Sequence, residues 1–344
     1  MSLSTPQDPE VLLSPELGNS SKFSGPTNLR TTLRLMALLG SLEILWAPVN
    51  FFVVIARQGG LSPAGIGLIR WFGICSGLFL ALSMPWFRSK TKAKMPSFRQ
   101  ALQCLIIGVL ITGPSHLMYY ASLGHTETVQ GTVFNATSPL WMAFFAGWLL
   151  DETVGLVRWL ALVIGGIGAY FASVGFAVPS FHQGHLGWNV IYLAGTLLEC
   201  LGGALLARII RKSSGIGAFA WETLGRGVAM IVFPLLLPEA LPMSIHFTAP
   251  GTIAMVYLIF VAGLFTFGAW VIVVERAPLS LMVVTIALQT PVAAVLGHYF
   301  LGEKLSTGLI FGAVLIFIGL GLAAKDSSNQ PLDESLVPSE AAAH

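Results

Sequence analysis

The feature that most constrains this chain is a series of long apolar stretches, each about as long as a helix that crosses a membrane. Such a helix needs about 20 predominantly apolar residues. Hydrophobic residues make up 55% of the chain and charged residues 10%, whereas a soluble domain has about a quarter of its residues charged. The sequence therefore predicts an all-α integral membrane protein with ten spans, at 34–56, 62–82, 101–123, 128–150, 155–175, 187–208, 217–237, 251–275, 279–301 and 305–324.

The two ends of the chain lack this apolar pattern. Residues 1–33 are rich in Ser and Pro, and residues 325–344 are mainly small and polar, so both are predicted to be disordered tails. The start of the chain has no basic segment followed by an apolar core and a cleavage site, and we expect no removable signal peptide. The first span is then expected to direct the chain to the plasma membrane, or to the inner membrane if the organism is a bacterium.

The basic residues predict the orientation of the chain, because cytoplasmic loops are enriched in Lys and Arg. Only Arg57 and Lys304 fall on one side of the predicted spans. Both termini are therefore predicted to lie in the cytoplasm. The basic residues on the cytoplasmic side are Lys22, Arg30, Arg34, Arg88, Lys90, Lys92, Lys94, Arg99, Arg158, Arg208, Arg211, Lys212, Arg276 and Lys325.

One pattern of the sequence occurs twice. The segments 129–152 and 281–304 each have a proline near the middle, an apolar and aromatic run after it and a glutamate at or near the end. A shift of 156 residues places Glu43 on Glu199 and Arg70 on Arg226. The chain is therefore predicted to consist of two five-helix repeats, at 34–175 and 187–324. Because five is odd, the repeats would insert in opposite directions and hold a substrate site between them, near the middle of the membrane.

Short motifs accompany the doubled segments. They are the run Trp46 to Asn50, Ser62-Pro63, Arg70-Trp71-Phe72, the DET at Asp151 to Thr153 and the GEKL at Gly302 to Leu305. In their order and doubling they resemble the drug/metabolite transporter superfamily, in its ten-helix EamA-type branch. The resemblance covers nearly all of residues 34–324. Asp151 stands where the family usually has glycine, and the seventh span lacks the Ser-Pro opening of the second.

The resemblance implies a secondary transporter that works by alternating access, more often outward than inward. Substrates in this family range from amino acids to sugars, nucleotide sugars and cationic drugs, so the resemblance implies a mechanism and leaves the substrate open. It also implies a small-molecule substrate, with protons as a candidate coupling ion.

Ionisable side chains inside a membrane are costly unless they face a partner or a water-filled cavity, and they are functional candidates for that reason. Glu43, Trp46 and Asn50 recur at i, i+3 and i+7, which places them on one face of the first span. That face is predicted either to line a cavity or to hold a buried ion pair between Glu43 and Arg70 of the next helix. The ionisable candidates are Glu43, Arg70, His116, Glu199, Glu222, Arg226 and His298.

The spacing of Glu222 and Arg226, i and i+4 on one helix, favours an ion pair with a structural role. Arg226 is expected to be shared between Glu222 and Glu199. Two further candidates, His116 and Tyr119, are predicted to line a pocket for a planar or apolar substrate.

Pro139 and Pro291 each remove a helical hydrogen bond and leave free the carbonyl four residues earlier. Those carbonyls, with the side chains of Asn135 and Gln289 beside them, are candidates for binding polar parts of a substrate. The alternative is a kink that serves packing alone, in which nearby side chains satisfy the free backbone groups.

Other function classes lack their minimal motifs. The sequence has no H-E-x-x-H, G-x-S-x-G or G-x-x-x-x-G-K-[ST], so zinc protease, serine hydrolase and ATP-driven pump are not predicted. No enzyme activity, cofactor, metal site or nucleic-acid partner is expected; the expected partners are the lipid bilayer and a small solute. The main alternative is a channel or lipid scramblase with a polar path between helices.

Overall fold

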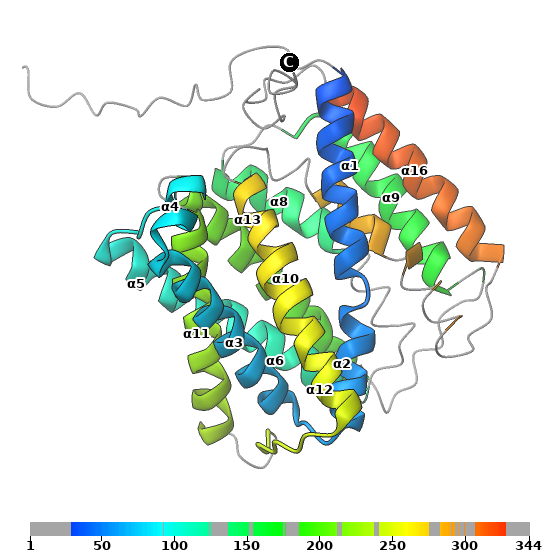
Figure 1. Ribbon diagram of the computed structural model, residues 1–344. Coiled ribbons are helices and arrows are strands. Elements are labelled where there is room, and N and C mark those ends of the chain that lie inside the picture. Colours follow the sequence, from blue (N-terminus) through cyan, green and yellow to red (C-terminus); the bar gives the residue numbers. More distant parts are fainter. Residues whose placement is uncertain are drawn as a thin grey trace, which may run out of the picture.

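The structure of the chain, a computed structural model, is a bundle of helices (Figure 1). It describes residues 29–91, 93–123, 125, 137–150, 154–174, 176, 186–211, 215–236, 241–274, 283–289, 291–292, 295, 299 and 307–327. The helices, in chain order, are α1 (Leu29–Trp46), α2 (Val49–Gln58), α3 (Pro63–Ser83), α4 (Pro85–Thr91), α5 (Phe98–Ile107), η1 (Gly108–Thr112), α6 (Gly113–Ser122), α8 (Ser138–Leu150), α9 (Leu156–Val174), α10 (Leu186–Ile210), α11 (Gly215–Leu236), α12 (Ala249–Val256), η3 (Tyr257–Phe267), α13 (Gly268–Val274), η4 (Val283–Leu288) and α16 (Thr307–Ser327).

Most of these helices lie within the predicted spans. α1 begins at Leu29, inside the segment predicted to be a tail, and α4 lies between the second and third spans. Three shorter apolar helices, Ser138–Leu150, Leu156–Gly168 and Ile310–Ala323, lie in the fourth, fifth and tenth spans. Of the ninth span, 279–301, the described part is η4 and a few residues after it. Among the described residues, six helical stretches are long and apolar enough to cross a membrane: Met36–Gln58, Pro63–Ser83, Phe98–Ser122, Val190–Ile210, Gly215–Leu236 and Ala249–Val273.

The first span is interrupted, which the sequence analysis did not predict. α1 ends at Trp46, and α2 begins at Val49 after a turn at Ala47 and Pro48. Pro48 has no amide hydrogen and cannot continue the hydrogen-bond ladder of α1. The hydroxyl of Tyr257 donates to the carbonyl of Leu45 at 2.6 Å, so a side chain from the other half satisfies a backbone group next to the break.

The third span of each half contains a stretch of π-helix. In the first half this stretch is η1, between α5 and α6, and in the second half it is η3, between α12 and α13. A π-helical turn adds a residue to the helix and re-aims the side chains beside it, and such turns are frequent at functional sites. Thr112, the last residue of η1, is one of the residues that the candidate site uses.

Packing follows an inverted two-fold pattern. The two second spans pack together as α3 and α11, and the two fifth spans as α9 and α16. α10, the first helix of the second half, packs on α6 and α8, while α1, its equivalent, packs on η3 and η4. Figure 1 shows α1, α9 and α16 together at one side of the bundle, away from α3, α5 and α11. Each half therefore contacts the other through equivalent helices.

Glycines allow the closest of these contacts, as the Gly-rich runs of the fifth and tenth spans predict. A Cβ at Gly168 of α9 would lie 2.7 Å from the carbonyl oxygen of Gly312 in α16. A Cβ at Gly319 of α16 would lie 2.8 Å from the carbonyl oxygen of Ala161 in α9. Larger side chains at these positions would force α9 and α16 apart.

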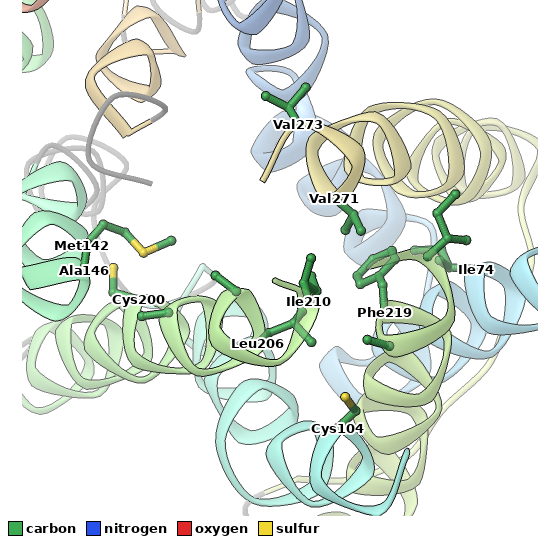
Figure 2. Packing of buried hydrophobic residues seen from close by; sticks show 14 of the residues in the cluster. Ile74, Cys104, Met142, Ala146, Cys200, Leu206, Ile210, Phe219, Val271 and Val273 are labelled. Atoms are coloured by element: carbon green, nitrogen blue, oxygen red, sulfur yellow. The ribbon is translucent and has the colours of Figure 1, made fainter. Parts of the chain in front are cut away.

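The apolar core joins helices of both halves. Figure 2 shows Met142 and Ala146 of α8 over Cys200 of α10, with Phe219 of α11 near Ile74 of α3. The three cysteines, Cys75, Cys104 and Cys200, are buried and form no disulfide. They act as small packing residues.

Candidate functional site

Buried charged side chains from both halves meet in the middle of the bundle. Arg70 lies near the middle of α3, and Glu222 and Arg226 lie near the middle of α11; the exposed fraction of each is at most 1%. The guanidinium carbon of Arg70 is 4.9 Å from the ring centre of Trp71, and that of Arg226 is 4.4 Å from the same ring. Both arginines therefore contact one indole, so the two repeat-related charges belong to a single site.

Arg226 forms closed ion pairs with two carboxylates. Its Nη2 donates to Oε1 of Glu199 at 3.1 Å, and its Nη1 lies 3.4 Å from Oε2 of the same residue. Its Nε donates to Oε1 of Glu222 at 2.6 Å. The prediction that Arg226 is shared between Glu199 and Glu222 is confirmed.

The first half of the chain supplies further partners to this pair. The hydroxyl of Thr112 donates to Oε1 of Glu222, and the hydroxyl of Ser115 donates to Oε2 of Glu199 at 3.1 Å. Both residues lie on the third span, at the end of η1 and the start of α6. A buried carboxylate is stable only when hydrogen bonds and an opposite charge replace its water, and these two hydroxyls contribute to that.

His116, one turn after Thr112, completes the group around Glu199. Its Nδ1 lies 3.0 Å from the carbonyl oxygen of Thr112 and 3.2 Å from Oε2 of Glu199. Nη1 of Arg226 lies 2.9 Å from the same nitrogen and 3.3 Å from Nε2. The imidazole is therefore in contact with both the acid and the cation of the pair.

Glu199 is the most accessible member of the cluster. Its side chain is 32% exposed, against 1% for Arg226 and 10% for His116. An acid that holds an arginine on one side and keeps a third of its surface exposed is able to meet a solute or a proton. Glu222, which is fully buried, cannot do so in this conformation.

The first-half pair is open. Arg70 donates from Nη1 to the hydroxyl of Tyr120 at 2.8 Å, while its Nε and Nη2 are buried and have no hydrogen-bond partner. Glu43 accepts instead from Nε2 of Gln289. The alternative of an ion pair between Glu43 and Arg70 is therefore wrong for this conformation. The reason is that tertiary packing brings Gln289 from the ninth span to Glu43 and Tyr120 from the third span to Arg70.

Aromatic rings surround Arg70. Its guanidinium carbon is 5.5 Å from the ring centre of Trp46, the last residue of α1 before the break. Tyr120 is buried and lies edge-on to Tyr119, which in turn lies 5.3 Å, between ring centres, from Tyr192 of α10. Trp46 and Tyr119, both predicted site residues, thus lie on the same side of the bundle as Arg70.

The remaining predicted residues are spread more widely. Asn50 lies on α2, one turn beyond the break, and is half-buried. Pro139 lies in the first turn of α8, where proline is well tolerated because its missing amide hydrogen would have no helical partner. Pro291, shortly after η4, has helical backbone. Asn135 and His298 lie outside the described residues.

Sequence reasoning missed several residues of the cluster. Thr112 and Ser115 carry no charge, and nothing in the local sequence distinguishes them from packing residues. Trp71 entered only as part of a motif, although it contacts both arginines. Spacing along the third span would have shown a signal, because Thr112, Ser115 and His116 recur at i, i+3 and i+4 and so share one helix face.

Comparisons with known proteins bear on the family and the fold of the chain. The sequence model of the EamA-like transporter family matches residues 34–174 and again residues 187–324. The uncharacterized inner membrane transporter YedA of Escherichia coli strain K12 is 25% identical over 308 residues, which cover 84% of this chain and 92% of YedA. The uncharacterized transporter sll0355 of Synechocystis is 22% identical over 321 residues, which cover 85% of this chain and 90% of that protein.

A solved structure shows the same fold. One crystal structure matches this chain with a TM-score of 0.68 at 16% identity. The match covers 86% of this chain and 98% of the other. Together with the doubled family match, it confirms the prediction of an all-α membrane protein with ten helices in two repeats.

Proposed function

We propose, from the premise that this chain belongs to the EamA-like transporter family, that it is a secondary carrier moving a small organic solute by alternating access. Membership makes the chain a multi-pass membrane transporter rather than an enzyme. The carrier mechanism, the direction of transport and the class of solute are the parts that we propose.

The observation that carries the proposal is the charged cluster where the two halves meet. Glu199 and Arg226 come from the second half, while Ser115, His116 and Arg70 come from the first. In carriers built from inverted repeats, one half moves against the other around a site between them. The contacts of a cluster with members from both halves would change during such motion. A solute bound there would shift the equilibrium between the two conformations.

We propose that transport is outward and that both termini lie in the cytoplasm. The direction follows the family resemblance, and the orientation follows the distribution of basic residues. One relative, YedA, is named as an inner membrane transporter, which supports the same location if this organism is a bacterium. Reporter fusions at the C-terminus should be active only as cytoplasmic reporters; activity restricted to the outside would contradict the orientation.

The carrier mechanism is tested in two steps. A panel of metabolites and drug-like solutes is first screened for thermal stabilisation of the purified protein. A stabilising solute is then added, in labelled form, outside sealed vesicles that contain the protein, with or without unlabelled solute inside them. A carrier gives saturable uptake and counterflow. Ion conductance without saturable exchange would show a channel instead, and lipid movement without solute exchange would show a scramblase.

We propose Glu199 as the candidate coupling residue, since it is the accessible acid of the cluster, with Glu43 as its counterpart in the first half. Glu199→Gln keeps the shape of the side chain and removes the charge. If protons are coupled through Glu199, uptake driven by a pH gradient is lost while exchange at equal pH remains. Loss of folded protein would indicate a structural pair. Full wild-type transport in both Glu199→Gln and Glu43→Gln would remove these acids from the mechanism.

A further inference from the structure

The buried guanidinium of Arg70 has an unsatisfied edge. Its exposed fraction is 1%, and its Nε and Nη2 have no hydrogen-bond partner. These two atoms carry the parallel N–H groups on one side of the guanidinium plane, the fork that matches the two oxygens of a carboxylate. The third donor group, Nη1, is occupied by Tyr120. The side of Arg70 that remains free is therefore the side best suited to a carboxylate.

A buried cation without a counter-charge is costly inside a membrane, so it is retained where a function needs it. Among the described residues, no salt bridge to Arg70 is formed, and the nearest repeat-related acid, Glu43, accepts from Gln289 instead. The equivalent edge of Arg226 is fully used, with Nε on Glu222 and Nη2 on Glu199. The second-half site therefore contains its own carboxylates, whereas the first-half arginine has no carboxylate partner among the described residues.

We propose that this edge of Arg70 binds the carboxylate of the transported solute, which makes the solute an organic carboxylate with a flat apolar body. This inference rests on the proposed carrier function. A carboxylate is favoured over a phosphate because it carries one negative charge, and one unpaired guanidinium edge offers one positive charge to balance it. Arg226 offers no second cation, since two glutamates already neutralise it.

The surroundings of Arg70 select the body of the solute. The indoles of Trp46 and Trp71 both lie against its guanidinium, and the ring of Phe267 lies 5.1 Å from that of Trp46, between centres. Such rings pack well against a planar apolar group. The indole nitrogen of Trp71 is also buried without a hydrogen-bond partner and adds a donor next to the guanidinium.

The break in the first span provides the way in. Trp46 is half-buried and is the last residue of α1, directly before the turn at Ala47 and Pro48. In this conformation it helps to cover Arg70. Interrupted helices in carriers surround binding sites because the break allows one helical part to move while the other stays packed. A shift of α1 at this turn would lift Trp46 and open the edge of Arg70 to the solute.

The test compares carboxylates with their neutral amides of the same shape. Benzoate and indole-3-acetate are titrated against benzamide and indole-3-acetamide, and binding to the purified full-length protein is followed by thermal stabilisation and calorimetry. We expect each carboxylate to bind at least roughly tenfold more tightly than its amide, because two charge-assisted hydrogen bonds are made only with the carboxylate. Equal binding of carboxylate and amide would overturn the proposal.

Two variants assign this preference to Arg70. Arg70→Gln should remove the preference for the carboxylate, and Arg70→Lys, which keeps the charge but lacks the fork, should reduce it. Arg99→Gln, at an exposed position near the start of α5, is the matched control and should keep the full preference. A preference that survives in folded Arg70→Gln would overturn the assignment.

A structure with 4-iodobenzoate needs no variant, because the iodine locates the ligand directly. The proposal requires its carboxylate within hydrogen-bond distance of Nε and Nη2 of Arg70, and any other location contradicts it. If exchange of some solute is saturable but carboxylates show no preference, the carrier function stands and this inference fails. The rival occupant of the edge is Glu43 in another conformation. It predicts no carboxylate preference and equal loss of exchange in Glu43→Gln, Arg70→Gln and the double variant.

Discussion

The two halves of the chain contain the same glutamate and arginine at equivalent positions, and the structure uses them differently. In the second half Glu199 and Arg226 are in contact at 3.1 Å, with Glu222, Ser115 and His116 around them. In the first half Glu43 and Arg70 each have another partner, Gln289 and Tyr120. The arginine of the second-half site is thus paired with carboxylates of the protein, while that of the first-half site is buried without one among the described residues.

The two sites differ because the third span of each half supplies side chains to the site of the other half. The third span of the first half brings Thr112, Ser115 and His116 to the pair of the second half. The third span of the second half, residues 249–274, has no ionisable Asp, Glu, His, Lys or Arg and contributes Phe267 and Tyr257 near the first-half site. The duplicated charge pair is therefore part of a polar cluster in the second-half site and of an aromatic site in the first-half site.

Removal of each arginine should give the largest difference in stability between the two sites. Arg226→Gln leaves the buried Glu222 and Glu199 without their cation, and we expect a loss of about 3–5 kcal/mol in the free energy of unfolding. Arg70→Gln removes a charge that has no ionic partner among the described residues. Its lost hydrogen bond to Tyr120, about 1.5–3 kcal/mol for a charged donor, is offset by the removal of the buried charge. Unfolding by SDS titration in mixed micelles measures both; equal losses would contradict the difference between the sites.

The first helices of the two halves offer a second comparison. Pro48 interrupts the first span, whereas Ala204, its equivalent at the same shift of 156, lies within the continuous helix α10. Ala204→Pro should destabilise the protein by about 3 kcal/mol, because it removes a helical hydrogen bond and introduces a clash. Pro48→Ala should change stability by less than about 1 kcal/mol but slow exchange, since the break then stiffens. Exchange at the wild-type rate in Pro48→Ala would show that the break does not move.

Threonines on the third spans give the smallest expected effect. Thr112→Val removes a hydroxyl that donates to Glu222 and should cost about 1.5–3 kcal/mol, the range for a hydrogen bond to a charged group. The control is Thr266→Val in η3, where the hydroxyl donates to the backbone carbonyl of Val261 at 2.8 Å, and the cost should be about 0.5 kcal/mol. Melting temperatures of the purified variants compare the two. Identical shifts would indicate that the hydroxyl of Thr112 does little to stabilise the buried charge of Glu222.

Much of the site was predictable where the interaction is local. Glu222 and Arg226 lie four residues apart on one helix, so their contact follows from helix geometry alone. The match of Glu43 with Glu199 and of Arg70 with Arg226 shows that the four belong to equivalent places. His116 was also a candidate, because an ionisable side chain inside a predicted span is costly. Trp46 was one because it shares a helix face with Glu43 and Asn50.

The choice of partners was not predictable. Arg70 and Glu43 lie on adjacent helices at depths that differ by about 8 Å when counted at about 1.5 Å per residue, a distance that a long arginine side chain can largely span. Whether Arg70 reaches Glu43 depends on which other hydrogen-bonding side chains lie close to each of them. Tyr120 is 50 residues from Arg70 in the chain, and Gln289 is 246 residues from Glu43, so only the packed bundle brings them together.

The sequence by itself therefore determined that the chain is a helical membrane protein, that it is a duplicated transporter of a recognisable family, and where its buried charges lie along the helices. Apolar length, helical period and repetition are properties of the chain read in order, and each acts over a few residues or at a fixed shift. Tertiary structure alone decided that one charge pair is closed and the other open. Side-chain contacts a few ångströms long depend on how helices from distant parts of the chain pack, and equivalent sequences receive different neighbours when each half packs against the other.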